Sequence, residues 1–131
     1  MLEPIGHGEF STVWKVREKK SGSLWAVKRG KPYKGIKDRQ KQLEEVQILQ
    51  TLAKQPHPHV LNFIEAWEEG DQLHLRTELA GCGDLATYLQ SIGDEGGLDE
   101  GRCWKLLFEL TSVSLSGNAK FLRKLSAWFR T

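Results

Sequence analysis

The spacing of apolar residues changes twice along this chain, and the change limits the folds that it can adopt. Apolar and polar side chains alternate over residues 12–18 (TVWKVRE) and again over 24–28, which is the pattern of a β-strand. From about Lys37 to Lys54 the apolar residues recur instead at spacings of three and four, as on one face of a helix. Two further short strands are expected over about 60–67 and 72–78. The pattern therefore predicts strands on both sides of one helix.

Turn-forming residues separate these segments. The Ser-Gly pair in KKSGS predicts a hairpin turn, so residues 2–29 are expected to form a three-stranded antiparallel meander. The prolines of QPHPH end the helix. A short helix near 85–91 and another over about 99–110, which Asp99 can cap, complete the chain. The predicted order is three strands, one helix, two strands and helices, an α+β fold.

Composition fits one domain and limits the ligands to consider. The 131 residues are enough for a single core, and the net charge of +2 favours no class of partner. Eleven Lys or Arg residues gather in residues 15–41; such a cluster can attract an anion or form a solvated surface. Two cysteines, Cys82 and Cys103, suggest neither a disulfide framework nor a zinc site. We expect no signal peptide, and no apolar run approaches the roughly 20 residues that span a bilayer.

Two glycines, Gly6 and Gly8, form a G-x-G pattern before the first clear strand. Alone, this pattern is more often a hairpin turn. Here Val13 follows five residues after Gly8, and Ala26-Val27-Lys28 ends the next strand. Glycine lets a backbone approach phosphate oxygens closely, and a strand lysine supplies a point charge for them. The context therefore favours a phosphate-binding loop, with Ser11 at the place of a third glycine.

A phosphate-binding lysine of this kind needs a carboxylate on the following helix to hold it. Glu44 and Glu45 both have the right side chain. At about 100° per residue, Glu45 lies roughly 50° from the centre of the apolar stripe, and Glu44 lies about 150° from it. We therefore expect Glu45 to face the sheet and pair with Lys28, and Glu44 to face solvent.

Two longer stretches, residues 9–49 and residues 63–89, resemble the Wee-type mitotic-inhibitor kinases in a form typical of fungi. The motifs EAWEEG and TELAGCGDL are more specific than the glycine loop, and the resemblance extends over about residues 2–112. It implies a protein-kinase-like N-terminal lobe, with a five-stranded antiparallel sheet and one helix. A helical stub of the C-terminal lobe is expected to follow.

The resemblance also assigns a nucleotide site to Ile5, Gly6, Gly8, Val13, Ala26, Lys28, Glu45, Thr77, Glu78, Ala80 and Asp84. By this resemblance Ile5, Val13 and Ala26 enclose the adenine, and Lys28 contacts the α- and β-phosphates. Thr77 takes the gatekeeper position, and the backbone of residues 78–81 is the hinge that binds the adenine edge. Asp84 either reaches the ribose or caps a helix.

The motifs that carry out phosphoryl transfer in this family do not occur in the sequence. No His-x-Asp is present, and none of the five aspartates precedes Phe, so the catalytic Asp and the metal-binding D-F-G are missing. We predict no catalytic residue and no metal ligand in the chain. The family uses Mg²⁺ with ATP, but the protein ligands of that ion are absent.

We expect three regions: the N-terminal lobe over residues 1–80, the hinge and start of the C-terminal lobe over 81–112, and a divergent tail over 113–131. The tail suggests a truncated product of an altered splice or reading frame. Five of its apolar residues would share one helical face: Phe121, Leu122, Leu125, Trp128 and Phe129. This segment is expected to be an interfacial membrane helix, a helix docked on the lobe, or an aggregation-prone tail.

The resemblance implies an ATP-dependent protein kinase that phosphorylates a cyclin-dependent kinase and so restrains mitotic entry. The alternative is a catalytically inactive remnant that binds nucleotide or a protein partner. The implied partners are ATP and the cyclin-dependent kinase rather than nucleic acid, and the implied location is the nucleus and cytoplasm.

Overall fold

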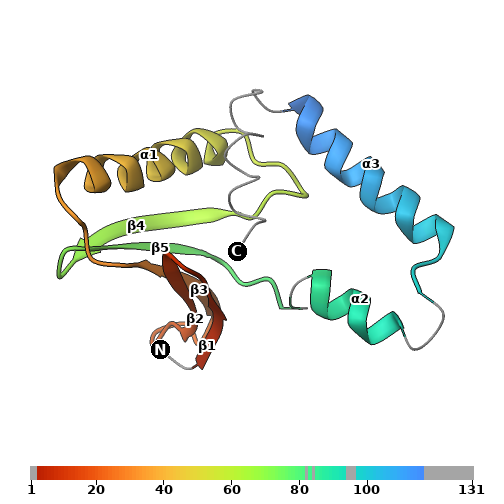
Figure 1. Cartoon of the computed structure of the whole chain (residues 1–131), viewed down its shortest axis with the longest axis horizontal. Helices are drawn as coiled ribbons and strands as arrows, with labels where there is room; N and C mark the ends of the chain where they lie inside the picture. Colours follow the sequence, from red (N-terminus) through yellow and green to blue (C-terminus); the bar gives the residue numbers. More distant parts are fainter. Residues whose placement is uncertain (1–2, 82, 84, 94–96, 117–131) are drawn as a thin grey trace.

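The computed structural model describes residues 3–81, 83, 85–93 and 97–116 (Figure 1). The elements of this part follow one another in the predicted order and confirm the α+β fold of a kinase-like N-terminal lobe with a helical stub. They are β1 (Glu3–His7), β2 (Ser11–Arg17), β3 (Leu24–Gly30), α1 (Ile36–Ala53), β4 (Phe63–Glu69), β5 (Gln72–Glu78), α2 (Leu85–Gly93) and α3 (Glu100–Ser116).

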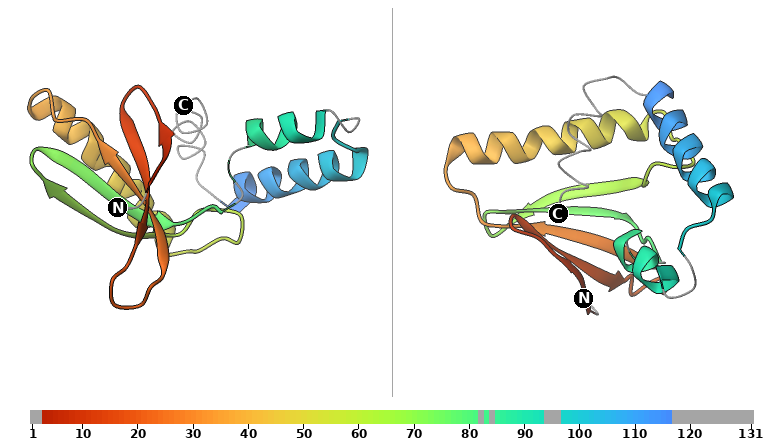
Figure 2. Two further views of the ribbon diagram at one scale, coloured as in Figure 1. Left: turned by 90° about the horizontal axis from the view of Figure 1, so that it is seen from below. Right: turned by 45° about the vertical axis from the view of Figure 1, so that its right-hand side comes forward.

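The five strands form one antiparallel sheet in the order β1-β2-β3-β5-β4. Because β5 inserts between β3 and β4, the strand that follows α1 lies at the sheet edge. Helix α1 lies along the half of the sheet made by β4 and β5, and α2 and α3 lie beyond the end of β5 (Figures 1 and 2). The sheet and α1 therefore form one packed unit, and the last two helices extend from it.

The core lies between α1 and the centre of the sheet. Val46 of α1 packs against Leu73 and Leu75 of β5, and all three are buried. Partly buried hydrophobic residues surround them: Tyr33, Leu43, Leu49, Phe63 and Ala66. Leu43, Val46 and Leu49 have the spacing of one helical face, and Leu73 and Leu75 have that of one strand face. The two sequence periodicities thus meet in one apolar layer.

The connection from β3 to α1 sets where the helix begins. Gly35 has φ of 106°, a backbone conformation that favours glycine, and α1 starts at the next residue. The backbone N–H of Lys34 donates a hydrogen bond to Asp38 Oδ2, with an N–O distance of 2.8 Å. Tyr33 in this connection packs on the core, and burial together with the nearby Glu68 carboxylate raises the pKa of the Tyr33 hydroxyl above its usual 10.0.

Two predicted boundaries were displaced by local hydrogen bonds and by packing. The strand expected from about Val60 begins at Phe63, because the Val60 N–H donates to the His57 carbonyl at 3.1 Å and so forms a turn. The last helix, expected to end near Leu110, continues to Ser116. Val113 in this extension is buried, and such burial stabilises helix beyond the span that propensity alone predicts.

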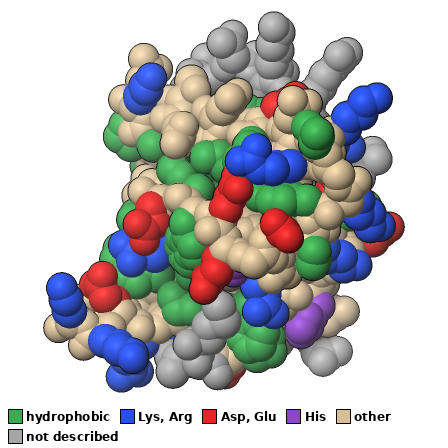
Figure 3. All heavy atoms as spheres, turned by 90° about the vertical axis from the view of Figure 1, so that its left-hand side faces the viewer, with side chains coloured by type: hydrophobic (Ala, Val, Ile, Leu, Met, Phe, Trp, Pro, Cys, Tyr) green, Lys and Arg blue, Asp and Glu red, His purple; other side chains and the backbone are tan. Residues whose placement is uncertain are grey.

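Opposite charges are interspersed on the face of the molecule that Figure 3 shows. Across α1 and β4, Arg39 Nη2 lies 2.8 Å from Glu68 Oε1, and the Arg39 Nε also donates to this carboxylate. Lys15 of β2 pairs with Glu3 of β1 at 3.1 Å. Part of the basic surplus over residues 15–41 is thus paired within the lobe, which weakens the case for a general anion-binding surface.

We predict that Leu75→Ala lowers the free energy of unfolding by about 2–5 kcal/mol, because Leu75 is 2% exposed and its removal leaves a cavity. Ile36→Ala is the matched control, since Ile36 is 78% exposed and its loss should cost about 0.5 kcal/mol or less. Urea unfolding followed by circular dichroism measures both. Equal effects of the two substitutions would contradict this placement of the core.

Candidate functional site

The strand register brings five of the predicted site residues onto one face of the sheet. Val13 of β2 pairs with Gly6 of β1 and with Lys28 of β3, and Ala26 of β3 pairs with Thr77 of β5. Paired residues in an antiparallel sheet point to the same side, as do residues two apart on one strand. These five residues therefore form a continuous strip across four strands.

Lys28 in this strip forms an ion pair with helix α1. Its Nζ lies 2.9 Å from Glu45 Oε1, within hydrogen-bonding distance. The two side chains keep 24% and 27% of their exposure, so the pair is largely shielded but still reached by water. Each charge offsets the desolvation of the other, and the contact holds the ammonium at a fixed place beside Ala26 and Val13.

The register of α1 explains why Glu45 and not Glu44 makes this contact. Val46 is buried against β5, and Glu45, one position before it, is partly buried, whereas Glu44 is exposed. The predicted contact between Lys28 and Glu45, and the outward direction of Glu44, are both confirmed. Burial of the apolar stripe fixes the rotation of α1 about its axis, and this rotation fixes the direction in which Glu44 and Glu45 point.

The glycines of the β1–β2 connection are not required by the conformation of the chain itself. Neither Gly6 nor Gly8 has a positive φ, and a Cβ at Gly6 would lie 3.7 Å from the Val13 Cβ, an ordinary contact. The Gly8 N–H donates to the Ser11 carbonyl at 2.8 Å and closes the turn. Ile5, the residue before Gly6, is 47% exposed.

The segment predicted as a hinge leaves the sheet at the end of β5. Thr77 is buried, and its hydroxyl donates to the Glu78 carbonyl at 3.0 Å. Beyond it, Ala80 and Gly81 are exposed. Asp84 lies outside the described residues.

Asn62 is a residue of this region that the sequence did not indicate. Its backbone N–H donates to Glu78 Oε1 at 2.8 Å, and its carbonyl accepts the Glu78 N–H at 3.0 Å. The Glu78 side chain is therefore directed to the loop before β4, which fixes the start of the hinge. No periodicity marks Asn62, because the contact joins residues that are sixteen positions apart.

Arg76 is a second residue that the sequence did not indicate. Its guanidinium lies 5.1 Å from the centre of the Trp25 ring, with its Nε 3.3 Å from a Glu65 carboxylate oxygen and its Nη1 3.6 Å from one of Glu18. Arg76 and Trp25 alternate with Thr77 and Ala26 along their strands, so they lie on the opposite face of the sheet from Lys28. Arg76 is thus a structural cation of the outer face.

The described residues offer no alternative metal or membrane site. Among them, no group of three or more His, Cys, Asp or Glu side chains could hold a metal ion. Within the same ranges, no helix is both long and apolar enough to cross a membrane.

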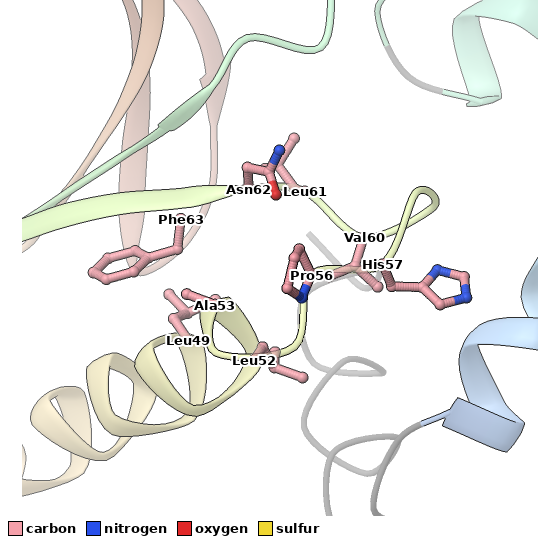
Figure 4. A pocket seen from close by; sticks show the side chains of 9 residues that line it. All are labelled: Leu49, Leu52, Ala53, Pro56, His57, Val60, Leu61, Asn62 and Phe63. Atoms are coloured by element: carbon pink, nitrogen blue, oxygen red, sulfur yellow. The ribbon is translucent and has the colours of Figure 1, made fainter.

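A small cavity of about 10 Å³ lies where the end of α1 meets the strand β4, between Leu49, Leu52, Pro56 and Phe63 (Figure 4). This volume is at the lower limit for a single water molecule. The end of α1 therefore packs closely against the loop before β4. The strip that contains Lys28 is the candidate site because of its ion pair with Glu45.

Comparisons with known proteins agree with this arrangement. The protein kinase domain family matches residues 1–113. The mitosis inhibitor protein kinase wee1 of Schizosaccharomyces pombe is 37% identical over 108 residues, which cover 81% of this chain and 12% of that protein. Wee1-like protein kinase 1-A of Xenopus laevis is 40% identical over 86 residues, which cover 65% of this chain and 15% of that protein. The chain thus spans only 12–15% of the length of these curated relatives.

We predict that Lys28 and Glu45 are energetically coupled by about 1 kcal/mol, at the upper end of what an exposed ion pair contributes. The measurement is a double-mutant cycle of Lys28→Met and Glu45→Gln, each followed by urea unfolding. Glu44→Gln in combination with Lys28→Met is the matched control, because Glu44 is the adjacent carboxylate and is exposed. Coupling that is no larger for Glu45 than for Glu44 would refute the contact.

Proposed function

The chain belongs to the protein kinase family, and on that basis we propose that its sheet and α1 form the ATP-positioning lobe of a Wee-type protein kinase. The observation that carries this proposal is the ion pair of 2.9 Å between Lys28 Nζ and Glu45 Oε1. A lysine that served only solubility would have no reason to lie beside a helix carboxylate on a largely shielded strip. A lysine that receives phosphate oxygens needs such a partner, because the carboxylate fixes its direction before the nucleotide arrives.

The other residues of the strip fit the remaining parts of ATP. Val13, Ala26 and Ile5 supply apolar surface for the adenine, and Ala26 is small enough to leave the ring space next to β3. Within the predicted hinge, the backbone of residues 79–81 would provide N–H and carbonyl groups for the adenine edge, since these residues follow the end of β5. The Glu78 N–H already donates to the Asn62 carbonyl. Glycine at positions 6 and 8 would let the phosphates approach the backbone closely.

The residues present do not fit a magnesium site. Mg²⁺ requires carboxylate or amide oxygens around it, and the 131 residues lack the family's catalytic-loop and D-F-G motifs. We therefore assign to this chain the binding and orientation of ATP, and no step of phosphoryl transfer. In the family, Mg²⁺ neutralises charge on the phosphates, and the catalytic Asp receives the proton of the substrate hydroxyl.

We further propose that the kinase to which this lobe belongs phosphorylates a cyclin-dependent kinase and so restrains mitotic entry. This rests on the Wee-type resemblance and on relatives named as mitosis inhibitor and Wee1-like kinases. By the same proposal we expect the kinase in the nucleus and cytoplasm, because it must reach its substrate where that substrate is active. The alternative, a remnant that only binds nucleotide or a partner, has no observation in its favour beyond the missing motifs.

We predict that the chain binds ATP weakly, with a dissociation constant on the order of millimolar, or about 4 kcal/mol of binding free energy. Only one side of the nucleotide is contacted, so affinity should be far below that of a complete kinase. An NMR titration with ATP measures it. Lys28→Ala should weaken binding several-fold, whereas Lys19→Ala should not, because Lys19 is exposed in the turn between β2 and β3. A micromolar constant, or equal effects of both variants, would contradict the proposal.

We predict no transfer of phosphate to a cyclin-dependent kinase by the purified chain, because the catalytic Asp is absent. A radiolabelled transfer assay, with a complete Wee-type kinase as positive control, measures it. Turnover that follows this chain through purification and is lost in Lys28→Ala would show that other residues replace the missing machinery.

A further inference from the structure

The side chain of Glu78, the last residue of β5, points away from the candidate site. In the register of β3 and β5, Trp25 pairs with Glu78 and Ala26 pairs with Thr77. Neighbouring residues of a strand point to opposite faces of the sheet, so Glu78 shares the face of Trp25, opposite the strip that contains Lys28. A nucleotide on that strip would therefore not touch the Glu78 carboxylate.

The Glu78 carboxylate instead takes the place of a backbone acceptor at the end of the sheet. In an antiparallel pair, two opposed residues exchange both of their N–H···O=C bonds. Asn62 and Glu78 make one of these bonds, since the Glu78 N–H donates to the Asn62 carbonyl at 3.0 Å. The other donor, the Asn62 N–H, goes to Glu78 Oε1 at 2.8 Å. A bond from N–H to a carboxylate is stronger than one between neutral groups, so this side chain firmly closes the pairing of β5 with the chain before β4.

This change of acceptor leaves the Glu78 carbonyl to a different donor. The buried Thr77 hydroxyl donates to that carbonyl at 3.0 Å. The N–H, the carbonyl and the carboxylate of Glu78 therefore each have a partner within the lobe. Residues 79–81 leave the sheet directly after a residue that is held at its backbone and at its side chain.

We propose that Glu78 is a positioning residue for the adenine base of ATP. Its carboxylate, bound to the Asn62 N–H, sets the point and the direction in which residues 79–81 leave the sheet. The inference rests on the proposed function, in which the backbone of residues 79–81 binds the adenine edge. A backbone segment that is fixed before the ligand arrives loses less entropy on binding. Lys28 and Glu78 then serve different parts of the nucleotide, the phosphates and the base.

The contact depends on the side chain of Glu78 and on the main chain of Asn62. The Asn62 Nδ2 lies 3.5 Å from Glu78 Oε2, longer than the usual N–H···O range of about 2.7–3.2 Å. Asn62→Ala keeps both main-chain groups and should have little effect. Glu78→Ala removes the acceptor of the Asn62 N–H, whereas Glu78→Gln keeps one oxygen that can accept it.

NMR titrations of the full chain with ATP and with inorganic tripolyphosphate separate the base from the phosphates. We expect Glu78→Ala to weaken ATP binding several-fold and to leave tripolyphosphate binding unchanged, and Glu78→Gln to recover most of the loss. Glu69→Ala is the matched control, because Glu69 is an exposed carboxylate at the other end of β4; it should change neither affinity. Lys28→Ala should weaken the binding of both ligands.

Amide hydrogen exchange reports the same contact without any ligand. Glu78→Ala should speed the exchange of the Asn62 amide several-fold, because its acceptor is lost. Asn62→Ala should leave the amide at position 62 slow. Unchanged exchange in β2 and β3 shows that the sheet of each variant remains folded.

Several results would overturn the inference. ATP binding that Glu78→Ala does not change would mean that the carboxylate has no role at the base, and an equal loss of tripolyphosphate binding would mean that it supports the lobe as a whole. A wild-type chain that binds ATP no better than tripolyphosphate would have no base recognition to position. In each of these cases, binding that still depends on Lys28 leaves the proposed function intact. Failure of the proposed function differs, because neither ligand would then bind in a way that depends on Lys28, and that result overturns both.

Discussion

The ion pair between Lys28 and Glu45 is the contact on which the candidate nucleotide site depends. It joins the central strand of the sheet to the one helix that lies along it, at a distance of 2.9 Å. Both side chains are about three-quarters shielded from water, and each charge offsets the desolvation of the other only while the two are in contact. The helix must therefore keep both its register and its distance from the sheet. Val46, packed against Leu73 and Leu75, supplies that constraint. The apolar layer thus places the helix, and the placed helix directs the lysine.

The basic side chains on the two faces of the sheet have different kinds of partner. On the face with Glu45, Lys28 pairs with that carboxylate and lies on the same strip as the small residue Ala26. On the other face, Arg29 lies 5.6 Å from the Trp14 ring centre and Arg76 lies 5.1 Å from that of Trp25, where cation–π attraction and shielding of the rings stabilise the sheet. The basic cluster in the sequence is therefore not one electrostatic surface. Of its strand members, Lys28 is the one whose surroundings suit a phosphate.

Much of this could be predicted from the sequence, because strand and helix periodicities fix which side of each element is apolar. The order of the elements, the α+β fold and the direction of Glu45 follow from that rule. The start of β4 and the end of α3 do not follow from it. The start of β4 depends on a backbone hydrogen bond from the Val60 N–H to the His57 carbonyl, and the end of α3 depends on the burial of Val113. Asn62 and Arg76 were missed for the same reason: each acts through partners distant in sequence. The roles of Lys28 and of the other predicted site residues toward a nucleotide stay predictions.

The most direct test of the central claim is chemical labelling of Lys28 with an acyl-phosphate derivative of ATP, read by mass spectrometry of every lysine in the chain. If Lys28 is positioned at the phosphates, it should be acylated in preference to exposed lysines such as Lys19 and Lys31, and excess ATP should suppress its labelling alone. Glu45→Gln should lower that preference, whereas Glu44→Gln should not. Labelling that is spread over the exposed lysines and is insensitive to ATP would contradict the account.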